Sequence, residues 1–332
     1  MKILVTGSNG FIGSHIVETL AGKGHQVVCL VRRTSNCQSL ECLKTATSRS
    51  IGIEKRIGDV THPKTLCDAV KGVDAVIHTA GILRTFNTEY YYHVNRDGTR
   101  NLAEAILEYN PRLKKLVYIS SQAAMGPSPE LRPKQMGEPE NPVSDYGMSK
   151  LAGEKELEIL MNKVPYTILR PAAVYGPRDK DIYIFFKLVN LGLRPRTAIK
   201  RYFQLVFVKD VAEAASRAIE IPASDYNTYF LADSTPYTWE EAALEIASAA
   251  GRKTIPLPAP DFAFKTAGFL AGIYARLRGK PAVLNSQKIT EFLQHFWLGD
   301  TSLAQKNLAM DFTKLKNGGK ITYSWYKDNK WL

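Results

Sequence analysis

The first 24 residues contain the feature that most constrains the fold. Residues 2–6 form a short apolar run that predicts a buried parallel strand, and residues 14–23 have the pattern of an amphipathic helix. Three glycines separate them: Gly7 permits a tight turn, Gly10 lets the backbone approach a pyrophosphate, and Gly13 lets helix and strand pack closely. Because N–H groups and the positive end of a helix dipole attract phosphate, the stretch predicts a dinucleotide-binding turn.

The second predicted strand, residues 26–31, is followed by Arg32 and Arg33. A free ribose 2′-hydroxyl usually meets an acidic residue near the end of this strand, whereas a 2′-phosphate favours arginine. Residues 19–40 contain neither Asp nor Glu. We therefore expect NADP(H) rather than NAD(H) as the cofactor. The alternative is that both arginines lie on a solvated loop.

Strands and helices alternate through the first half of the chain. Further strands are expected at 53–58, 74–79, 114–120 and 164–169, and helices at 63–70, at 89–109 and from 145 onward. This alternation predicts an α/β fold with a doubly wound parallel sheet. Beyond Gly176 the alternation fades. We expect residues 1–175, with about 203–233, to form the dinucleotide-binding domain, and about 176–202 and 234–332 to form a smaller α+β substrate-binding region.

The composition of the chain limits the classes of partner and the cellular compartment that we expect. The 332 residues are 45% hydrophobic and 23% charged, as in an ordinary globular protein. The net charge of +12 suits phosphorylated ligands or anionic lipid, but no nucleic-acid motif accompanies it, so we expect no nucleic-acid partner. We expect no metal site, no signal peptide and no membrane span. The four cysteines are expected to be reduced thiols in a cytoplasmic protein: Cys29, Cys37, Cys42 and Cys67.

Three residues form a candidate catalytic group. Tyr146 and Lys150 are four residues apart on a predicted helix, so their side chains share one face. A lysine ammonium beside a phenol lowers the pKa of the phenol, which suits it to proton transfer. Ser121 directly follows a predicted strand, at the sheet edge where ligands of open α/β folds bind. Its hydroxyl could stabilise charge on a substrate oxygen. The alternative for the Tyr/Lys pair is a solvated helix face.

A series of motifs resembles those of the extended short-chain dehydrogenases/reductases, the NAD-dependent epimerase/dehydratase superfamily. The motifs are residues 6–13, 59–60, 78–81, 95–99, 119–121, 146–150, 170–177 and 207–212. The resemblance implies hydride transfer in which Tyr146 is the general acid/base, Lys150 holds the ribose, and Ser121 orients the substrate oxygen. It implies that Asn95 helps to position Lys150. The cofactor site that we expect comprises Gly7, Asn9, Gly10, Phe11, Ile12, Gly13, Arg32, Arg33, Asp59, Val60, Thr79, Ala80, Gly81, Tyr146, Lys150, Pro171 and Val174.

Within this superfamily, the chain looks most similar to the dihydroflavonol-reductase and 3β-hydroxysteroid-dehydrogenase branch. Ala172 and Ala173 stand where sugar-nucleotide enzymes of the superfamily usually have Asn, and Met125 replaces a Tyr at a position that affects substrate specificity. We therefore favour an NADP(H)-dependent reductase. One alternative is a nucleotide-sugar epimerase or dehydratase with bound NAD. A second is a non-catalytic NADP-binding assembly protein.

Residues 262–280 bear on the substrate and on the partners. An uncharged stretch at 266–275 is preceded by two phenylalanines and followed by basic residues. Such a helix can contact an anionic membrane or line a pocket for a lipid-like substrate, and the alternative is ordinary packing. We expect a small, hydrophobic substrate. The resemblance also implies a homodimer, formed through the helices at about 89–109 and 145–161.

Overall fold

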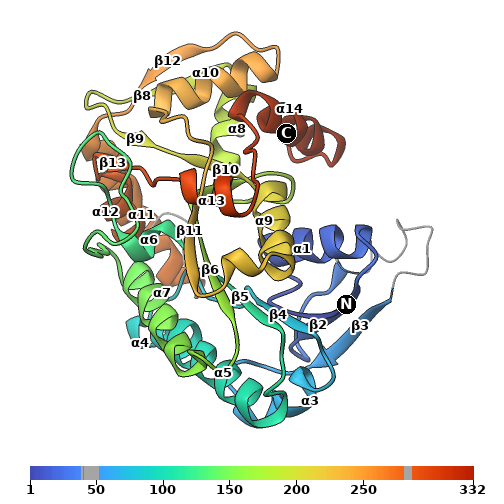
Figure 1. Ribbon diagram of the computed structural model, residues 1–332. Helices are drawn as coiled ribbons and strands as arrows, with labels where there is room; N and C mark the ends of the chain where they lie inside the picture. Colours follow the sequence, from blue (N-terminus) through green and yellow to red (C-terminus); the bar gives the residue numbers. More distant parts are fainter. Residues whose placement is uncertain (39, 41–51, 280–285) are drawn as a thin grey trace.

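The computed structural model describes residues 1–38, 40, 52–279 and 286–332. Its centre is a sheet of seven parallel strands in the order β11-β6-β5-β4-β1-β2-β3 (Figure 1). The chain runs outward from β1 to β3 and then resumes on the other side of β1 with β4, which confirms the doubly wound fold. The strands are β1 (Lys2–Thr6), β2 (Gln26–Val31), β3 (Ile53–Ile57), β4 (Ala75–His78), β5 (Lys115–Ile119), β6 (Tyr166–Pro171) and β11 (Asn227–Leu231).

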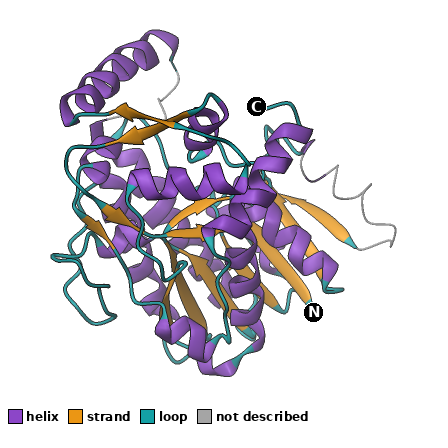
Figure 2. Ribbon diagram, turned by 90° about the horizontal axis from the view of Figure 1, so that it is seen from above, coloured by secondary structure: helices purple, strands orange, loops and turns teal. Residues whose placement is uncertain are grey.

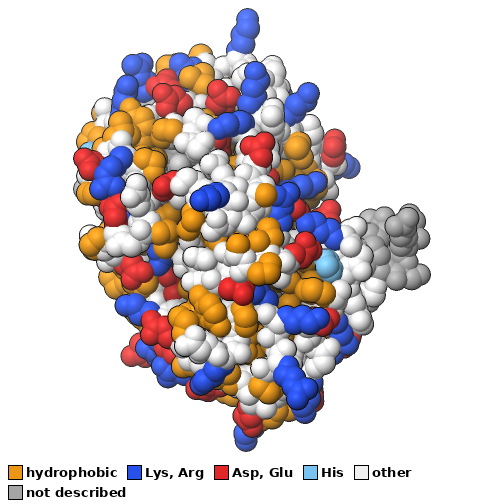
Figure 3. All heavy atoms as spheres, viewed as in Figure 1, with side chains coloured by type: hydrophobic (Ala, Val, Ile, Leu, Met, Phe, Trp, Pro, Cys, Tyr) orange, Lys and Arg blue, Asp and Glu red, His pale blue; other side chains and the backbone are white. Residues whose placement is uncertain are grey.

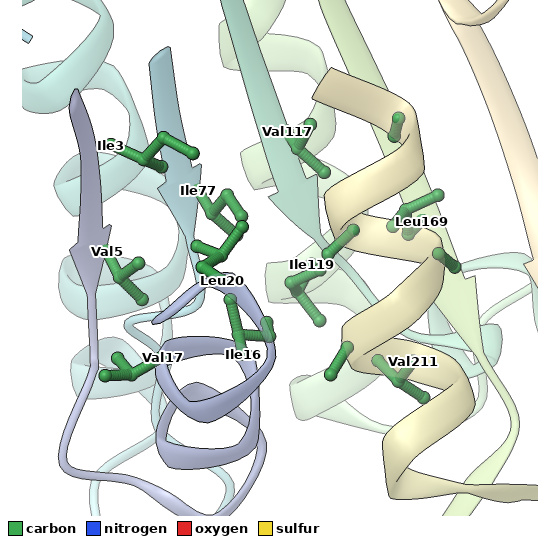
Figure 4. Packing of buried hydrophobic residues seen from close by; sticks show 14 of the residues in the cluster. Ile3, Val5, Ile16, Val17, Leu20, Ile77, Val117, Ile119, Leu169 and Val211 are labelled. Carbon is green, nitrogen blue, oxygen red and sulfur yellow. The ribbon is translucent and has the colours of Figure 1, made fainter. Parts of the chain in front are cut away.

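Apolar layers cover both faces of this sheet, as expected of parallel strands. Along β1, Ile3 and Val5 belong to one buried cluster and Leu4 to the other, because successive side chains of a strand point to opposite faces. The first cluster packs against α1 (Phe11–Gly22) and α9 (Val208–Glu220). Figure 4 shows Val5 on the side of α1 and Ile119 and Leu169 on the side of α9. The second packs against α3 (Cys67–Val70) and α5 (Gly98–Tyr109).

The helix predicted at 89–109 is divided into three parts. It consists of α4 (Thr88–Tyr92), a π-helical segment (His93–Asp97) and α5. π-helical turns are rare and are frequent at functional sites, and this one contains Asn95. The helix predicted from residue 145 is α7 (Asp145–Lys155), which continues as a 3₁₀ helix (Glu156–Leu160). Ser144 is its N-cap, because its hydroxyl accepts a hydrogen bond from the Gly147 N–H at 3.0 Å.

Short strands and further helices form the part of the molecule above the sheet in Figure 1. Parallel pairs link β7 (Ala173–Tyr175) with β10 (Leu205–Phe207), β8 (Leu193–Arg196) with β12 (Ile255–Pro258), and β9 (Tyr202–Phe203) with β13 (Phe296–Trp297). The remaining helices of the described residues, in this part and beside the sheet, are α6 (Gln122–Met125), α8 (Tyr183–Asn190), α10 (Trp239–Ala249), α11 (Asp261–Arg278), α12 (Ser286–Phe292), α13 (Ser302–Asn307) and α14 (Leu315–Asp328), with 3₁₀ turns at Pro63–Thr65 and Pro222–Ser224. We propose that the domain division expected from the sequence applies, because β11 belongs to the main sheet.

The described residues also bear on the expectations about membrane spans, metal sites, cysteines and surface charge. None of their helices is both long and apolar enough to cross a bilayer, and they contain no group of three or more His, Cys, Asp or Glu side chains placed to hold a metal ion. Cys29, Cys37 and Cys67 form no disulfide with one another, and Cys42 lies outside the described residues. On the face shown in Figure 3, basic and acidic side chains are interspersed.

Candidate active site

The turn between β1 and α1 has the geometry that its glycines predict. Gly7 adopts φ of +64°, in the left-handed region that favours glycine. A Cβ at Gly13 would lie 2.1 Å from the Gly7 carbonyl oxygen, so a larger residue would push α1 away from the turn. Gly10 is the N-cap of α1, and no described side chain caps the first N–H groups of this helix. The turn therefore fits a pyrophosphate. Asn9, Phe11 and Ile12 belong to the same turn.

The carboxyl end of β4 lies directly beside the glycine turn. Thr79 Oγ1 donates a hydrogen bond to the Thr6 carbonyl oxygen at 2.6 Å, and the Ala80 N–H donates to Thr6 Oγ1 at 3.1 Å. Gly81 follows, and a Cβ at this position would lie 3.8 Å from Lys150 Nζ. The structure thus brings the residues after β4 between the glycine turn and the predicted catalytic group.

Ser121 lies close enough to Tyr146 to lower the pKa of its phenol, at the end of β5. Ser121 is the N-cap of α6, and its hydroxyl also accepts from the Ala123 N–H at 3.1 Å. A Cβ at Gly147 would lie 2.4 Å from the Ala123 carbonyl oxygen. Gly147 therefore allows α7 to approach α6, and this approach places the Tyr146 hydroxyl within reach of Ser121. Sequence analysis did not assign Gly147 this role, although its place beside Tyr146 was a signal.

The Tyr146 hydroxyl is protonated at neutral pH. Its side chain retains partial solvent contact, but desolvation raises the pKa of Tyr146 well above its usual value, while the nearby Ser121 hydroxyl opposes that rise and the negative charge of Glu291 adds to it. The expectation that Lys150 lowers the pKa of this phenol is therefore wrong in this structure. A protonated phenol is the form that donates a proton to a substrate oxygen.

Lys150 is buried and directed toward other partners. Its Nζ donates to the Ile119 carbonyl oxygen at 2.8 Å and lies 4.1 Å from the centre of the Tyr118 ring. Burial lowers the pKa of Lys150 to about 7, and the negative charge of Glu154, one helical turn away, acts in the opposite direction. The amine therefore changes charge near neutral pH.

Replacing Lys150 with methionine should stabilise the fold while it removes activity. The ordinary pKa of this amine is 10.5 and its folded value is about 7, so between these pH values the unfolded chain binds more protons. The free energy of unfolding should therefore rise with pH from about 7 to about 10.5. Below about pH 7 the amine is charged in both states, so the buried ammonium destabilises the fold to its full extent. We expect Lys150→Met to melt roughly 2–5 °C higher at pH 6, with a smaller difference at pH 9. Calorimetry at both pH values tests this, and an equal difference at both would contradict it.

Asn95 is completely buried and bridges two segments of the site. Its Oδ1 accepts from the Ile82 N–H at 2.8 Å, and its Nδ2 donates to the Ile82 carbonyl oxygen at 3.1 Å and to Ser149 Oγ at 2.9 Å. Among the described residues it forms no hydrogen bond with Lys150. Its side chain instead fixes the chain after Gly81 against α7, on the turn before Lys150. That Asn95 positions Lys150 remains a prediction.

Comparisons with known proteins agree with this geometry. Residues 3–231, more than half of the chain, match the NAD dependent epimerase/dehydratase family. The chain belongs to this family. The family's extended short-chain dehydrogenases/reductases are the group that the sequence motifs resemble, so that prediction is confirmed, and the chain is an enzyme of this type.

Two relatives and one solved structure illustrate the range of the family. The chain is 28% identical to a ceramide reductase from Caulobacter vibrioides over 331 residues, which are 99% of this chain and 96% of the relative. It is 30% identical to the human 3 beta-hydroxysteroid dehydrogenase type 7 over 308 residues, 85% of this chain and 82% of the relative. A UDP-glucose 4-epimerase from Thermus thermophilus, solved with NAD, has 24% identity and a TM-score of 0.75 over 98% of this chain and 99% of its own.

The residues after β2 and β3 form the end of the predicted cofactor site that lies away from Tyr146. Arg32 and Arg33 are both exposed, and neither pairs with a carboxylate of the described residues. Asp59 Oδ1 accepts from the Thr61 N–H at 3.0 Å. Val60 is buried against Gly98, where a Cβ would lie 2.8 Å from Val60 Cγ2. Asp59 therefore has local partners, whereas the two guanidinium groups are available for an anion.

A buried ion pair below Lys150 was not predicted from the sequence. Arg170, at the end of β6, donates to both carboxylate oxygens of Glu154, at 3.0 and 2.5 Å, and to Glu140 at 2.8 Å. The Arg170 side chain is 3% exposed and that of Glu154 is 5% exposed. Ser120 also donates to Glu154. The available signal was the acidic residue one helical turn after Lys150, opposite an arginine in a strand.

Met125 is part of the buried network around Arg170 rather than of the substrate-binding surface. Its side chain is buried, and its Sδ accepts a hydrogen bond from Arg170 Nη1 at 3.1 Å. Its carbonyl oxygen accepts from Lys134 Nζ at 2.8 Å. The replacement of the family's usual Tyr by Met125 therefore gives no direct evidence on which substrate is bound.

Two loops meet near Tyr146 on the substrate side. Arg84, after β4, forms an ion pair with Asp181, before α8, and Asp181 contributes to the raised pKa of Tyr146. Leu83 and Phe86 are exposed on either side of Arg84. Pro171 ends β6, and Val174 lies in β7, the next strand along the chain. That these two residues contact the cofactor remains a prediction.

Proposed function

We propose that this protein is an NADP(H)-dependent oxidoreductase, which transfers a hydride to or from a carbonyl or hydroxyl carbon of a small, hydrophobic substrate. The observation that carries the proposal is the proximity of the Tyr146 and Ser121 hydroxyl groups, together with a glycine turn that follows β1 of the same parallel sheet. An acid paired with an oxygen-binding hydroxyl, next to a dinucleotide cradle, suits chemistry at a carbon that bears oxygen.

The residues of this chain fit the cofactor, and different residues would bind it and transfer the proton. The nicotinamide, when bound, supplies or accepts the hydride. The glycine turn would hold the pyrophosphate through the uncapped N–H groups at the start of α1, because Gly13 lets this helix pack closely against Gly7. In the direction of reduction, Tyr146 donates its proton to the substrate oxygen, while Ser121 donates a hydrogen bond to the same oxygen. Lys150 holds the ribose at the base of the site.

A hydrophobic substrate is favoured over a sugar nucleotide. Leu83 and Phe86 expose apolar side chains on either side of Arg84, and Ala172 and Ala173 stand where sugar-nucleotide enzymes of the family usually have Asn. One relative, which matches almost the whole of both chains, is named a ceramide reductase. Contact of residues 262–280 with a membrane is part of the same proposal, because a lipid-like substrate partitions into bilayers. Homodimer formation through α5 and α7 is a further part of it.

Changing the two arginines after β2 should reverse the cofactor preference. In Arg32→Asp/Arg33→Ser, the 2′-phosphate loses its charged donors and the 2′-hydroxyl gains an acceptor. We expect the ratio of kcat/KM for NADPH over NADH to fall roughly 10²-fold. Arg112→Asp, at an exposed arginine before β5, is the control and should leave the ratio unchanged. An unaltered ratio in the double variant would show that Arg32 and Arg33 do not contact the cofactor.

The nucleotide that copurifies with the protein tests the proposal most directly. We expect exchangeable NADPH or NADP⁺, together with reduction of hydrophobic ketones or aldehydes. The alternative is a nucleotide-sugar epimerase or dehydratase, which some relatives' names favour, since they include UDP-glucose 4-epimerases. Tightly retained NAD and activity only on sugar nucleotides would select that alternative and overturn the reductase.

A further inference from the structure

The helix α11 (Asp261–Arg278) exposes a large apolar surface. It is the long helix at the upper left of Figure 2, set off from the rest of the molecule and leading into the grey residues 280–285. The exposed fraction is 71% for Phe262, 68% for Phe269 and 81% for Leu277, with Leu270 and Ile273 also exposed. Contiguous apolar surface of this kind usually marks an interaction site.

The exposed apolar residues of α11 lie along a single stripe. At 3.6 residues per turn, Phe262, Phe269, Leu270, Ile273 and Leu277 fall within about 100° of the helix circumference. The buried positions Gly268 and Ala275 lie on the opposite side. Among the side chains that the structure describes, the buried ones are thus small and the large apolar ones are exposed. This arrangement is the reverse of an ordinary surface helix, whose apolar stripe faces the core.

Charge identifies the surface that α11 fits. Arg276 and Arg278 are exposed in its last turn. The acidic residue of α11, Asp261, is bound at the first turn by Arg201, whose Nη1 and Nη2 donate to its two carboxylate oxygens at 2.9 and 2.6 Å. An apolar stripe with exposed arginines, on a chain of net charge +12, matches an anionic bilayer, where apolar side chains enter the interface and arginines meet lipid phosphates. We propose that α11 lies on an anionic membrane surface through this stripe.

The contact would be linked to the candidate active site, because α11 packs on α12 and α12 is bonded to the start of α7. Ser144, the N-cap of α7, donates to Glu291 at 2.6 Å, and the Asp145 N–H donates to Gln287 Oε1 at 3.0 Å. Tyr146 follows directly. A membrane-bound α11 therefore holds the catalytic helix close to the bilayer. The delivery of a hydrophobic substrate rests on the proposed function, whereas the membrane contact is inferred from the residues of α11 alone.

Co-sedimentation of the full chain with vesicles tests the contact without any substrate. We expect the protein to bind vesicles that contain phosphatidylglycerol and to bind pure phosphatidylcholine at least roughly tenfold more weakly. Phe269→Gln/Leu277→Gln and Arg276→Glu/Arg278→Glu should each reduce binding to the anionic vesicles roughly tenfold or more. Leu131→Gln/Ile321→Gln, at exposed apolar positions outside α11, is the matched control and should bind like the unaltered protein.

The competing outcome is a second copy of this chain on the same stripe. Light scattering would then show a dimer that Phe269→Gln/Leu277→Gln dissociates, without binding to either type of vesicle, and this result would overturn the proposal. Equal binding by the α11 variants and the control would also overturn it. Reduction of a water-soluble ketone with NADPH, measured without vesicles, should be unchanged in the α11 variants. Loss of reductase activity with retained vesicle binding would contradict the proposed function but not the contact.

Discussion

Tyr146→Phe should reduce turnover roughly 10²–10⁴-fold while the binding of NADPH remains within a few-fold of the unaltered protein. The substitution removes the hydroxyl that lies near Ser121 and leaves the ring, whose centre is 6.4 Å from that of Tyr91. The loss should therefore fall on kcat rather than on cofactor affinity. Steady-state rates with a hydrophobic ketone and titration of NADPH fluorescence measure the two quantities.

Tyr91→Phe is the matched control for this experiment. Its hydroxyl donates to the Leu83 carbonyl oxygen at 3.2 Å, and its ring is a neighbour of Tyr146, so the same chemical change is made in an adjacent ring. We expect a change in kcat of no more than a few-fold. If Tyr146→Phe retained activity to the same extent, Tyr146 would not be the general acid, whatever the cofactor.

The sheet could be predicted closely because its strands carry their own signals. The predicted strands at 26–31, 53–58, 74–79, 114–120 and 164–169 lie within two residues of the observed ones. Four of them, β2, β4, β5 and β6, are largely apolar runs buried on both faces. The fifth, β3, is an edge strand with charged and exposed residues between Ile53 and Ile57. The short pairs β7 with β10 and β9 with β13 could not be found in this way. They are two or three residues long, and they exist because distant segments meet, which no local pattern records.

The candidate site was predictable in position but not in its electrostatics. The spacing of Tyr146 and Lys150 places both on one helix face, and the structure brings Ser121 to Tyr146 as expected. Spacing does not report burial, however. The desolvation that raises the pKa of Tyr146 and lowers that of Lys150 depends on the packing of α7 against α6 and the π-helical segment. That packing requires Gly147 and Gly153, whose Cβ atoms would collide with neighbouring backbone carbonyl groups.

The buried ion pair between Arg170 and Glu154 leads to the largest expected effect on stability. Arg170→Met would leave Glu154 without its guanidinium partner in a place where its side chain is 5% exposed. Removal of one member of a buried pair leaves a charge without compensation, and it destabilises proteins by about 3–5 kcal/mol. We expect a decrease of this size in the free energy of unfolding, measured by urea denaturation at neutral pH, with weaker cofactor binding as α7 loses its support.

Replacing both partners should restore much of that stability. In Arg170→Met/Glu154→Leu no charge is left at the centre of the network, so a double-mutant cycle should give a favourable coupling of roughly 2 kcal/mol or more between the two positions. The double variant also removes the carboxylate that raises the pKa of Lys150, and the pKa of this buried amine should fall further below its value of about 7. If Arg170→Met lost less than about 1 kcal/mol, or if the two losses were additive, Glu140 and Ser120 rather than Arg170 would be the groups that stabilise Glu154 below the catalytic helix.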